Sequence, residues 1–292
     1  MEFAAIKQAK VQIMQRQPYF SGFDSISVKV AAQLMPEAIP LHARPCSATD
    51  AVIICVHGFT SNPYEISPVA DALANAGLAA VVPLLPGHGY REHFRQRQEF
   101  AKITKDGMLN AVRQEIARAR EQYSQVGMLG FSMGGAIALS MAAEGLLDAC
   151  AVVAPAIRLP LKGEILIPLL SWARFTLNAP VKDPFYLPVY TFHHSRALRS
   201  LWQLSRHARS QLPKIQCPIL GIHSYQDPVV PPIVLDIMQE RIPNAIEMAW
   251  FDHSGHVMQL DVSGDAVAAK IADFFKRQFL SLESTTSIPS IR

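Results

Sequence analysis

The chain reads Val126-Gly-Met-Leu-Gly130-Phe131-Ser132-Met133-Gly134-Gly135, and the run Ala136-Ile-Ala-Leu-Ser-Met-Ala-Ala follows at once. The apolar start predicts a buried strand, and the alanine-containing run predicts a helix. A strand that turns abruptly into a helix forces the serine between them into a strained backbone conformation, which the flanking glycines permit because they have no side chains to clash. Ser132 is therefore the candidate nucleophile, and the helix start behind it presents free N–H groups to developing negative charge.

Two later loops supply a candidate acid and a candidate base. The strand predicted at 217–223 leads into a loop that holds Asp227, and the strand predicted at 246–251 leads into a loop that holds His256. With Ser132 upstream, the chain order is Ser, Asp, His. This is the order expected of an α/β-hydrolase.

An earlier loop supplies a candidate oxyanion donor. The buried strand predicted at 50–56 ends in the glycine-containing turn His57-Gly58-Phe59, and Pro63 then lies near the first turn of the next helix. A backbone N–H group of this loop can complete an oxyanion site together with the helix start behind the serine.

Five segments together give the sequence a resemblance to the α/β-hydrolase superfamily, and within it to the microbial carboxylesterases and monoacylglycerol lipases. They are the HGFTSN loop, the LPGHG segment at 85–89, the GFSMGG elbow, the QDPVVPP loop and the HSGH loop. The resemblance covers about residues 50–278 and is specific for fold and triad, much less so for substrate. It implies that Ser132 is the nucleophile, Asp227 the orienting acid and His256 the base. It also implies that the backbone N–H groups of Phe59 and Met133 form the oxyanion hole.

Other residues compete for two of these roles. His253 is the alternative base and Asp252 the alternative acid, while Asp227 could also serve only as a helix cap. The resemblance favours His256, which lies at the entry to the last helix, and Asp227, which follows a strand. Three further histidines fit loop-stabilising or rim positions better than catalysis, namely His57, His88 and His93.

Strand and helix patterns alternate along the chain, which predicts the α/β-hydrolase fold: a mostly parallel eight-stranded sheet flanked by helices, with a helical cap insertion. Strands are predicted near 25–34, 39–44, 51–56, 78–83, 125–130, 149–154, 217–223 and 245–250, the first two as an antiparallel entry. Helices are predicted at 63–76, 106–122, 133–144, 231–241 and 262–280. The predicted parts are an N-terminal helix or extension (1–24), the α/β-hydrolase core (25–156 and 214–280), the cap (157–213) and a disordered tail (281–292).

The cap is predicted because residues 157–213 separate two strands that one crossover helix would normally join. A lid over a hydrolase site has an inner face, and the apolar clusters of this segment suit an acyl chain. The predicted substrate contacts are Phe59 from the core and four residues of the cap: Leu166, Leu170, Trp172 and Phe175.

The same cap is basic. It holds eight basic and two acidic residues, a net charge of +6, whereas the rest of the chain has a net charge of −3. A solvated lid surface explains this charge; the alternatives are steering of an acidic leaving group and transient contact with an anionic membrane surface.

Composition excludes several classes of function. A net charge of +3 is too small to indicate nucleic-acid binding, and no nucleic-acid motif is present. The four cysteines have no CxxC spacing, which predicts reduced core residues of a cytoplasmic protein and no metal site. Neither a secretory signal nor a membrane span is predicted, no cofactor is expected, and the sequence gives no oligomeric state.

The predicted function is that of a serine hydrolase that cleaves carboxylic esters through an acyl-enzyme, with short- to medium-chain acyl esters or monoacylglycerol-like lipids as substrates. The same triad on this fold also cleaves thioesters and carbon–carbon bonds, and in some plant proteins the fold perceives hormones. A thioesterase, a carbon–carbon bond hydrolase and a ligand-binding receptor therefore remain alternatives at this point.

Overall fold

Strand β2 (Ala51–Val56) shows why the sheet is covered on both faces. In the computed structural model, which describes residues 17–280, every residue of β2 is buried. Val52, Ile54 and Val56 pack into one apolar cluster, and the residues that alternate with them pack into a second cluster on the other face. An apolar run without polar alternation is what a parallel strand with helices on both sides requires.

The central sheet has seven strands in the order β1-β3-β2-β4-β5-β8-β9. All neighbouring strands run parallel except β1, which pairs antiparallel with β3. Besides β2, the strands are β1 (Leu41–Ala43), β3 (Ala79–Val82), β4 (Gln125–Phe131), β5 (Ala149–Val153), β8 (Ile219–Ser224) and β9 (Glu247–Phe251). The mostly parallel sheet of the prediction is therefore present.

The prediction of an eighth strand, at 25–34, is wrong. Residues Val28–Ala31 form the short helix α2, and the Val28 side chain is 87% exposed. The alternation of apolar residues indicated a strand, but alternation stabilises a strand only where one of its faces is covered. Here the segment is anchored instead by Leu34, which bridges to Tyr90 and is completely buried. Of the N-terminal helix or extension predicted at 1–24, residues 1–16 lie outside the described residues, as does the tail at 281–292; residues 17–24 form no helix.

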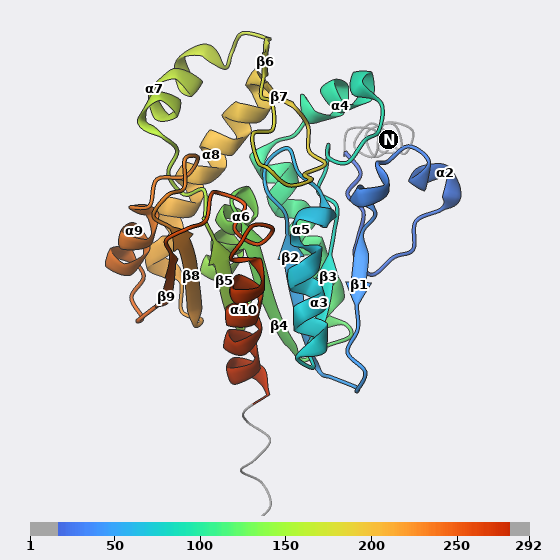
Figure 1. The fold of residues 1–292 in the computed structure, drawn as a ribbon, viewed down its shortest axis with the longest axis vertical. Helices are drawn as coiled ribbons and strands as arrows, with labels where there is room; N and C mark the ends of the chain where they lie inside the picture. The colour runs from blue at the N-terminus through green and yellow to red at the C-terminus, as the bar shows by residue number, and fades with distance from the viewer. Residues whose placement is uncertain (1–16, 281–292) are drawn as a thin grey trace, which may run out of the picture.

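Helices cover the two faces of the sheet in separate layers (Figure 1). On one face, α3 (Ser67–Asn75) packs against α10 (Gly264–Phe279). On the other face, α6 contacts both α5 and α8. The helices that complete the body are α4 (His93–Phe100), α5 (Lys105–Arg120), α6 (Met133–Ala143), α8 (Ser195–Gln211) and α9 (Val234–Arg241), together with the 3₁₀ turns Pro36–Ala38, Pro63–Ile66 and Leu212–Lys214.

The segment predicted as the cap has an outer and an inner part. Its outer part contains helix α7 (Leu161–Leu170), which has no buried residue, and the hairpin β6–β7 (Thr176–Asn178 and Phe192–His194); Figure 1 shows both beyond one end of the sheet. Its inner part is fixed to the body, because the N–H of Tyr190 donates to the carbonyl of Thr60 at 2.9 Å and helix α8 packs on α6. Among residues 17–280, no helix combines the length and the apolar character needed to cross a membrane.

Candidate active site

Ser132 lies on a strained turn between β4 and α6. Its backbone has φ +52° and ψ −111°, a conformation that residues other than glycine rarely adopt. The turn needs glycine nearby: a Cβ on Gly134 would lie 2.1 Å from the backbone oxygen of Val56, and a Cβ on Gly130 would lie 2.2 Å from the oxygen of Gly134. The Gly-x-Ser-x-Gly pattern thus reflects the close approach of α6 to two neighbouring strands.

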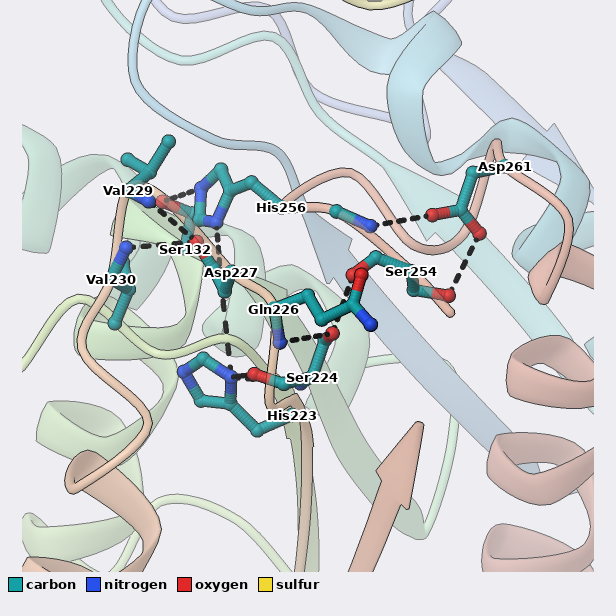
Figure 2. A network of polar contacts seen from close by, with 11 residues as sticks. Ser132, His223, Ser224, Gln226, Asp227, Val229, Val230, Ser254, His256 and Asp261 are labelled. Carbon is teal, nitrogen blue, oxygen red and sulfur yellow. Dashed lines mark hydrogen bonds and ion pairs between the residues drawn. The ribbon is translucent and has the colours of Figure 1, made fainter. Parts of the chain in front are cut away.

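Three side chains from three different loops form a continuous chain of hydrogen bonds (Figure 2). Nε2 of His256 lies 3.0 Å from Oγ of Ser132, and Nδ1 of His256 lies 2.7 Å from Oδ2 of Asp227. With Nδ1–H donating to the carboxylate, Nε2 is free to accept the serine proton. The structure therefore brings together the three residues predicted as nucleophile, acid and base.

The Asp227 carboxylate is held as an ion although it is buried. Burial alone would raise its pKa, but the hydrogen bond and charge of His256 and two backbone N–H donors outweigh that effect and hold the pKa below its ordinary value. The N–H groups of Val229 and Val230 donate to Oδ1 at 2.7 and 2.9 Å. Oδ2 is thereby left to face the imidazole.

A second polar network fixes the loop that carries His256 (Figure 2). Asp261 accepts the N–H of Gly255 at 3.0 Å and the hydroxyl of Ser254 at 3.0 Å. The hydroxyl of Ser224, at the end of β8, donates to the carbonyl of Ser254. These contacts tie the His256 loop to the strand that precedes Asp227. No sequence pattern predicts this network, because it joins polar residues of the loop between β9 and α10 to the end of β8, some 30 residues earlier in the chain.

The competing residues are placed elsewhere. Asp252 and His253 are exposed, and among the described residues Asp227 is the carboxylate that contacts the His256 ring nitrogens. His57 and His88 are buried, and burial lowers the pKa of both, to about 4 for His88. His93 is the first residue of α4, and its Nδ1 lies 3.3 Å from Oε1 of Gln96.

A further histidine, not singled out in the sequence, lies behind the acid. His223 is fully buried in β8, with Nδ1 4.0 Å from Oδ2 of Asp227 (Figure 2). Burial lowers its pKa. Because His223 belongs to an apolar strand, the sequence alone made it look like an ordinary core residue.

The two backbone N–H groups predicted for the oxyanion hole have no acceptor of their own in residues 17–280. Met133 is the first residue of α6, where an N–H has no intrahelical partner. Phe59 lies in the turn after β2, and its N–H makes none of the turn and loop hydrogen bonds of that segment. Its ring packs on Phe100 and on His193 of the hairpin, with centroids 5.0 and 5.6 Å apart.

The predicted cap contacts are spread over an exposed surface. Leu166 and Leu170 on α7 are each 48% exposed, and Trp172 just after the helix is 75% exposed. Phe175 is half-buried, and its backbone carbonyl accepts the N–H of Ser195 at 3.0 Å. The structure thus brings Phe59 beside the cap, and it leaves three of the four cap residues open to solvent.

Two hollows of the surface lie apart from Ser132, Asp227 and His256. One, of about 480 Å³, lies between α4 and the outer cap and has a cationic lining that includes Arg97, Lys102, Arg174 and Arg196. A second is lined by residues of α5 and α8, such as Trp202 and Arg206. No group of three or more His, Cys, Asp or Glu side chains among residues 17–280 is arranged to hold a metal ion.

A strained serine at the end of a parallel strand, with a histidine and a buried carboxylate from later loops, defines an α/β-hydrolase. Residues 53–270 match the family described as "Alpha/beta hydrolase family", and the chain belongs to that family. The predicted resemblance is therefore confirmed.

Relatives of known identity are lipases and esterases. The chain is 29% identical over 235 residues to the thermostable monoacylglycerol lipase of Bacillus sp. (strain H-257), covering 77% of this chain and 90% of that protein. It is 22% identical over 242 residues to the carboxylesterase of Bacillus subtilis (strain 168), covering 78% of this chain and 93% of that one.

Solved structures agree on the fold. A structure from work on the metagenome-derived lipolytic enzymes LipS and LipT superposes with a TM-score of 0.77 at 24% identity, covering 84% of this chain and 100% of that chain. The monoacylglycerol lipase of Paleococcus ferrophilus superposes with a TM-score of 0.66 at 16% identity, covering 82% and 99%. The predicted fold class is confirmed, with seven strands in the central sheet in place of eight.

Proposed function

We propose that this protein is a serine hydrolase that cleaves carboxylic esters through an acyl-enzyme intermediate, with Ser132, His256 and Asp227 as its catalytic triad. The observation that carries the proposal is the pair of hydrogen bonds made by His256, 3.0 Å to Ser132 and 2.7 Å to Asp227. This is the nucleophile, base and orienting acid arrangement of serine hydrolases.

The first chemical step follows from that geometry. Nε2 of His256 takes the proton as Oγ of Ser132 attacks the ester carbonyl, and the Asp227 carboxylate stabilises the imidazolium that results. The N–H groups of Phe59 and Met133 bind the oxyanion of the tetrahedral intermediate. His256 then returns the proton to the departing alcohol, which leaves an ester between the acyl group and Ser132.

Water completes the cycle by the same steps. His256 takes a proton from water as the water oxygen attacks the acyl-enzyme, and the proton then passes to Oγ of Ser132 as the acid product leaves. In related chemistry the loss of one oxyanion donor slows the reaction by roughly 10²- to 10³-fold. The two backbone donors therefore account for a large part of the rate.

For the substrate, we propose short- to medium-chain acyl esters or monoacylglycerol-like lipids. Two observations support this class: the relatives named above are a monoacylglycerol lipase and a carboxylesterase, and the cap contributes several apolar side chains on α7. Of the predicted contacts, Phe59 itself supplies one of the proposed oxyanion N–H groups. Leu166, Leu170, Trp172 and Phe175 would enclose the acyl chain from the cap.

A series of p-nitrophenyl esters of increasing chain length tests this substrate class. Each methylene that the protein buries stabilises the complex by about 0.8 kcal/mol, so kcat/KM should rise roughly fourfold per added carbon until the pocket is full. Medium chains should therefore be hydrolysed faster than acetate, and acyl-CoA thioesters should be poorer substrates than esters of the same chain.

A matched pair of variants locates the source of that preference. Changing Leu166 and Leu170 to glutamine should flatten the chain-length profile. Leu161→Gln is the control: Leu161 is 71% exposed at the start of the same helix, and its variant should keep the wild-type profile. A folded Leu166/Leu170 variant that keeps the full wild-type profile would show that acyl selection arises within the α/β core.

We also propose that the basic cap makes transient contact with anionic membrane surfaces. Large apolar side chains of the cap, among them Ile165, Leu169 and Trp172, are exposed, and the same cap supplies Arg174 and Arg196 to the cationic hollow. Basic residues near such a surface contribute about 1 kcal/mol each, and salt screens them.

Co-sedimentation with vesicles checks the membrane contact. The protein should pellet with phosphatidylglycerol vesicles at low salt, less at high salt, and little with phosphatidylcholine vesicles. Leu169→Asp should weaken pelleting, and Val28→Asp should not, although Val28 on α2 is an even more exposed apolar residue, at 87% against 60% for Leu169. Equal pelleting of wild type and Leu169→Asp would argue against contact through the cap.

A further inference from the structure

Glu65 is a buried carboxylate that the mechanism above does not use. It lies in the 3₁₀ turn Pro63–Ile66, and only 3% of its surface is exposed. A buried carboxyl group is destabilising unless it is hydrogen bonded. Its Oε2 accepts the backbone N–H of Gly58 at 2.8 Å.

That contact lies one residue before an oxyanion donor. Gly58 directly precedes Phe59, so the two share the peptide unit whose N–H is proposed to bind the oxyanion. A Cβ on Gly58 would lie 3.1 Å from Oε2 of Glu65 and 3.1 Å from the ring of Phe131. The Glu65 carboxylate therefore packs directly on the backbone at the start of this loop.

The carbonyl of the same peptide unit is held by His57. Nδ1–H of His57 donates to the oxygen of Gly58 at 3.0 Å, while Nε2 accepts the N–H of Leu85 at 3.2 Å. Because a trans peptide is planar, the N–H of Phe59 points opposite to the Gly58 carbonyl. Fixing Gly58 at its N–H and at its carbonyl thus fixes the direction of the Phe59 N–H.

The surroundings of Glu65 favour the protonated, uncharged form of its carboxyl group more than water does. Burial raises its pKa to about 7, an effect that the Gly58 N–H and the nearby His256 partly oppose and that Asp183 of the cap reinforces. An oxygen that accepts the Gly58 N–H is available in either protonation state of the carboxyl group.

We propose that Glu65 is a positioning residue of the oxyanion hole, which acts by holding the Gly58 N–H and so aiming the Phe59 N–H at the reacting carbonyl. This inference rests on the proposed serine hydrolase function. In this role the acceptor oxygen of Glu65 holds the Gly58 N–H, and the negative charge of the carboxylate is not required.

Two substitutions whose side chains are about as long as that of glutamate test the role of that oxygen. Glu65→Met fills the space without an acceptor, and kcat should fall by on the order of 10- to 100-fold, less than the full loss of an oxyanion donor, with KM little changed. Glu65→Gln retains an acceptor oxygen and should restore kcat to within about threefold of the wild type. If the methionine variant does not fold, Glu65→Ala is measured with the same expectation.

Inhibition by a trifluoromethyl ketone separates positioning from general stability. The hemiketal oxyanion that this inhibitor forms with the serine needs the oxyanion donors, so its Ki should rise in Glu65→Met by the same factor as kcat falls. Asn62→Ala is the matched control: it removes the cap at Tyr64 N–H and the contact to the Pro188 carbonyl in the same segment, without touching Gly58. It should lower the melting temperature but leave the ketone Ki close to that of the wild type.

The outcomes are distinguishable from failure of the proposed function. A wild-type protein that a fluorophosphonate does not label at Ser132 would contradict the function itself. A folded Glu65→Met variant with wild-type kcat and ketone Ki would overturn only the role of Glu65. So would a folded Glu65→Gln variant as impaired as Glu65→Met, because the acceptor oxygen would then be insufficient.

Discussion

Ser132→Ala is expected to reduce ester hydrolysis by on the order of 10⁶-fold, to the level that binding and the oxyanion donors support without a nucleophile. The side chain provides the only atom that bonds to the acyl group in the proposed cycle, so no other residue of the triad can compensate. Alanine keeps the Cβ of serine and adds no bulk, so the strained turn between β4 and α6 should survive. The melting temperature should stay close to that of the wild type.

Mapping of a covalent adduct checks this expectation directly. A fluorophosphonate should modify the wild type at Ser132, and Ser132→Ala should not react. Ser140→Ala is the matched control, because Ser140 is a buried serine of α6, the helix that follows Ser132, and its hydroxyl donates to the Ala136 carbonyl at 2.8 Å. An active enzyme that carries the adduct on another residue would remove Ser132 from the proposed role.

The turn at Ser132 could be predicted from the sequence because its geometry requires glycines at fixed positions around the serine. Gly130 and Gly134 stand where a Cβ would meet backbone atoms at 2.2 and 2.1 Å, so the pattern around Ser132 follows from local sterics. The candidate acid and the candidate base could be predicted because each follows a predicted strand in the expected chain order. Parallel pairing then brings the ends of β4 and β8 to the same edge of the sheet through β5.

Features that depend on contacts between residues far apart in the sequence could not be predicted in this way. The alternating apolar residues at 25–34 predicted a strand, but Val28–Ala31 within it form helix α2, which has no buried residue. In the sequence, Glu65 falls in the first turn of the helix predicted at 63–76, a position where the helix dipole favours an acidic residue. Its contact with Gly58 depends on how the loop folds back. The length of chain between two predicted strands indicated an insertion at 157–213, but not that α8 packs on α6 while α7 stays exposed.

Asp227→Asn is expected to lower kcat by on the order of 10⁴-fold while the protein stays folded. The asparagine oxygen can still accept the N–H groups of Val229 and Val230, which in the wild type donate to Oδ1 at 2.7 and 2.9 Å. Its amide nitrogen would then face Nδ1 of His256 in place of the carboxylate oxygen. An N–H donor there favours the imidazole tautomer that carries its proton on Nε2, which cannot accept the proton of Ser132.

Asp252→Asn is the matched comparison, because Asp252 also follows a strand and precedes His256 but is exposed. Its kcat should remain within about threefold of the wild type, since exposed substitutions away from the site rarely perturb the reaction. Measuring kcat, KM and the melting temperature of both variants separates a chemical effect from a loss of folding. If folded Asp252→Asn shows the large loss and Asp227→Asn the small one, then Asp252 orients His256 during the reaction, and the 2.7 Å contact of Asp227 with His256 does not persist in the working enzyme.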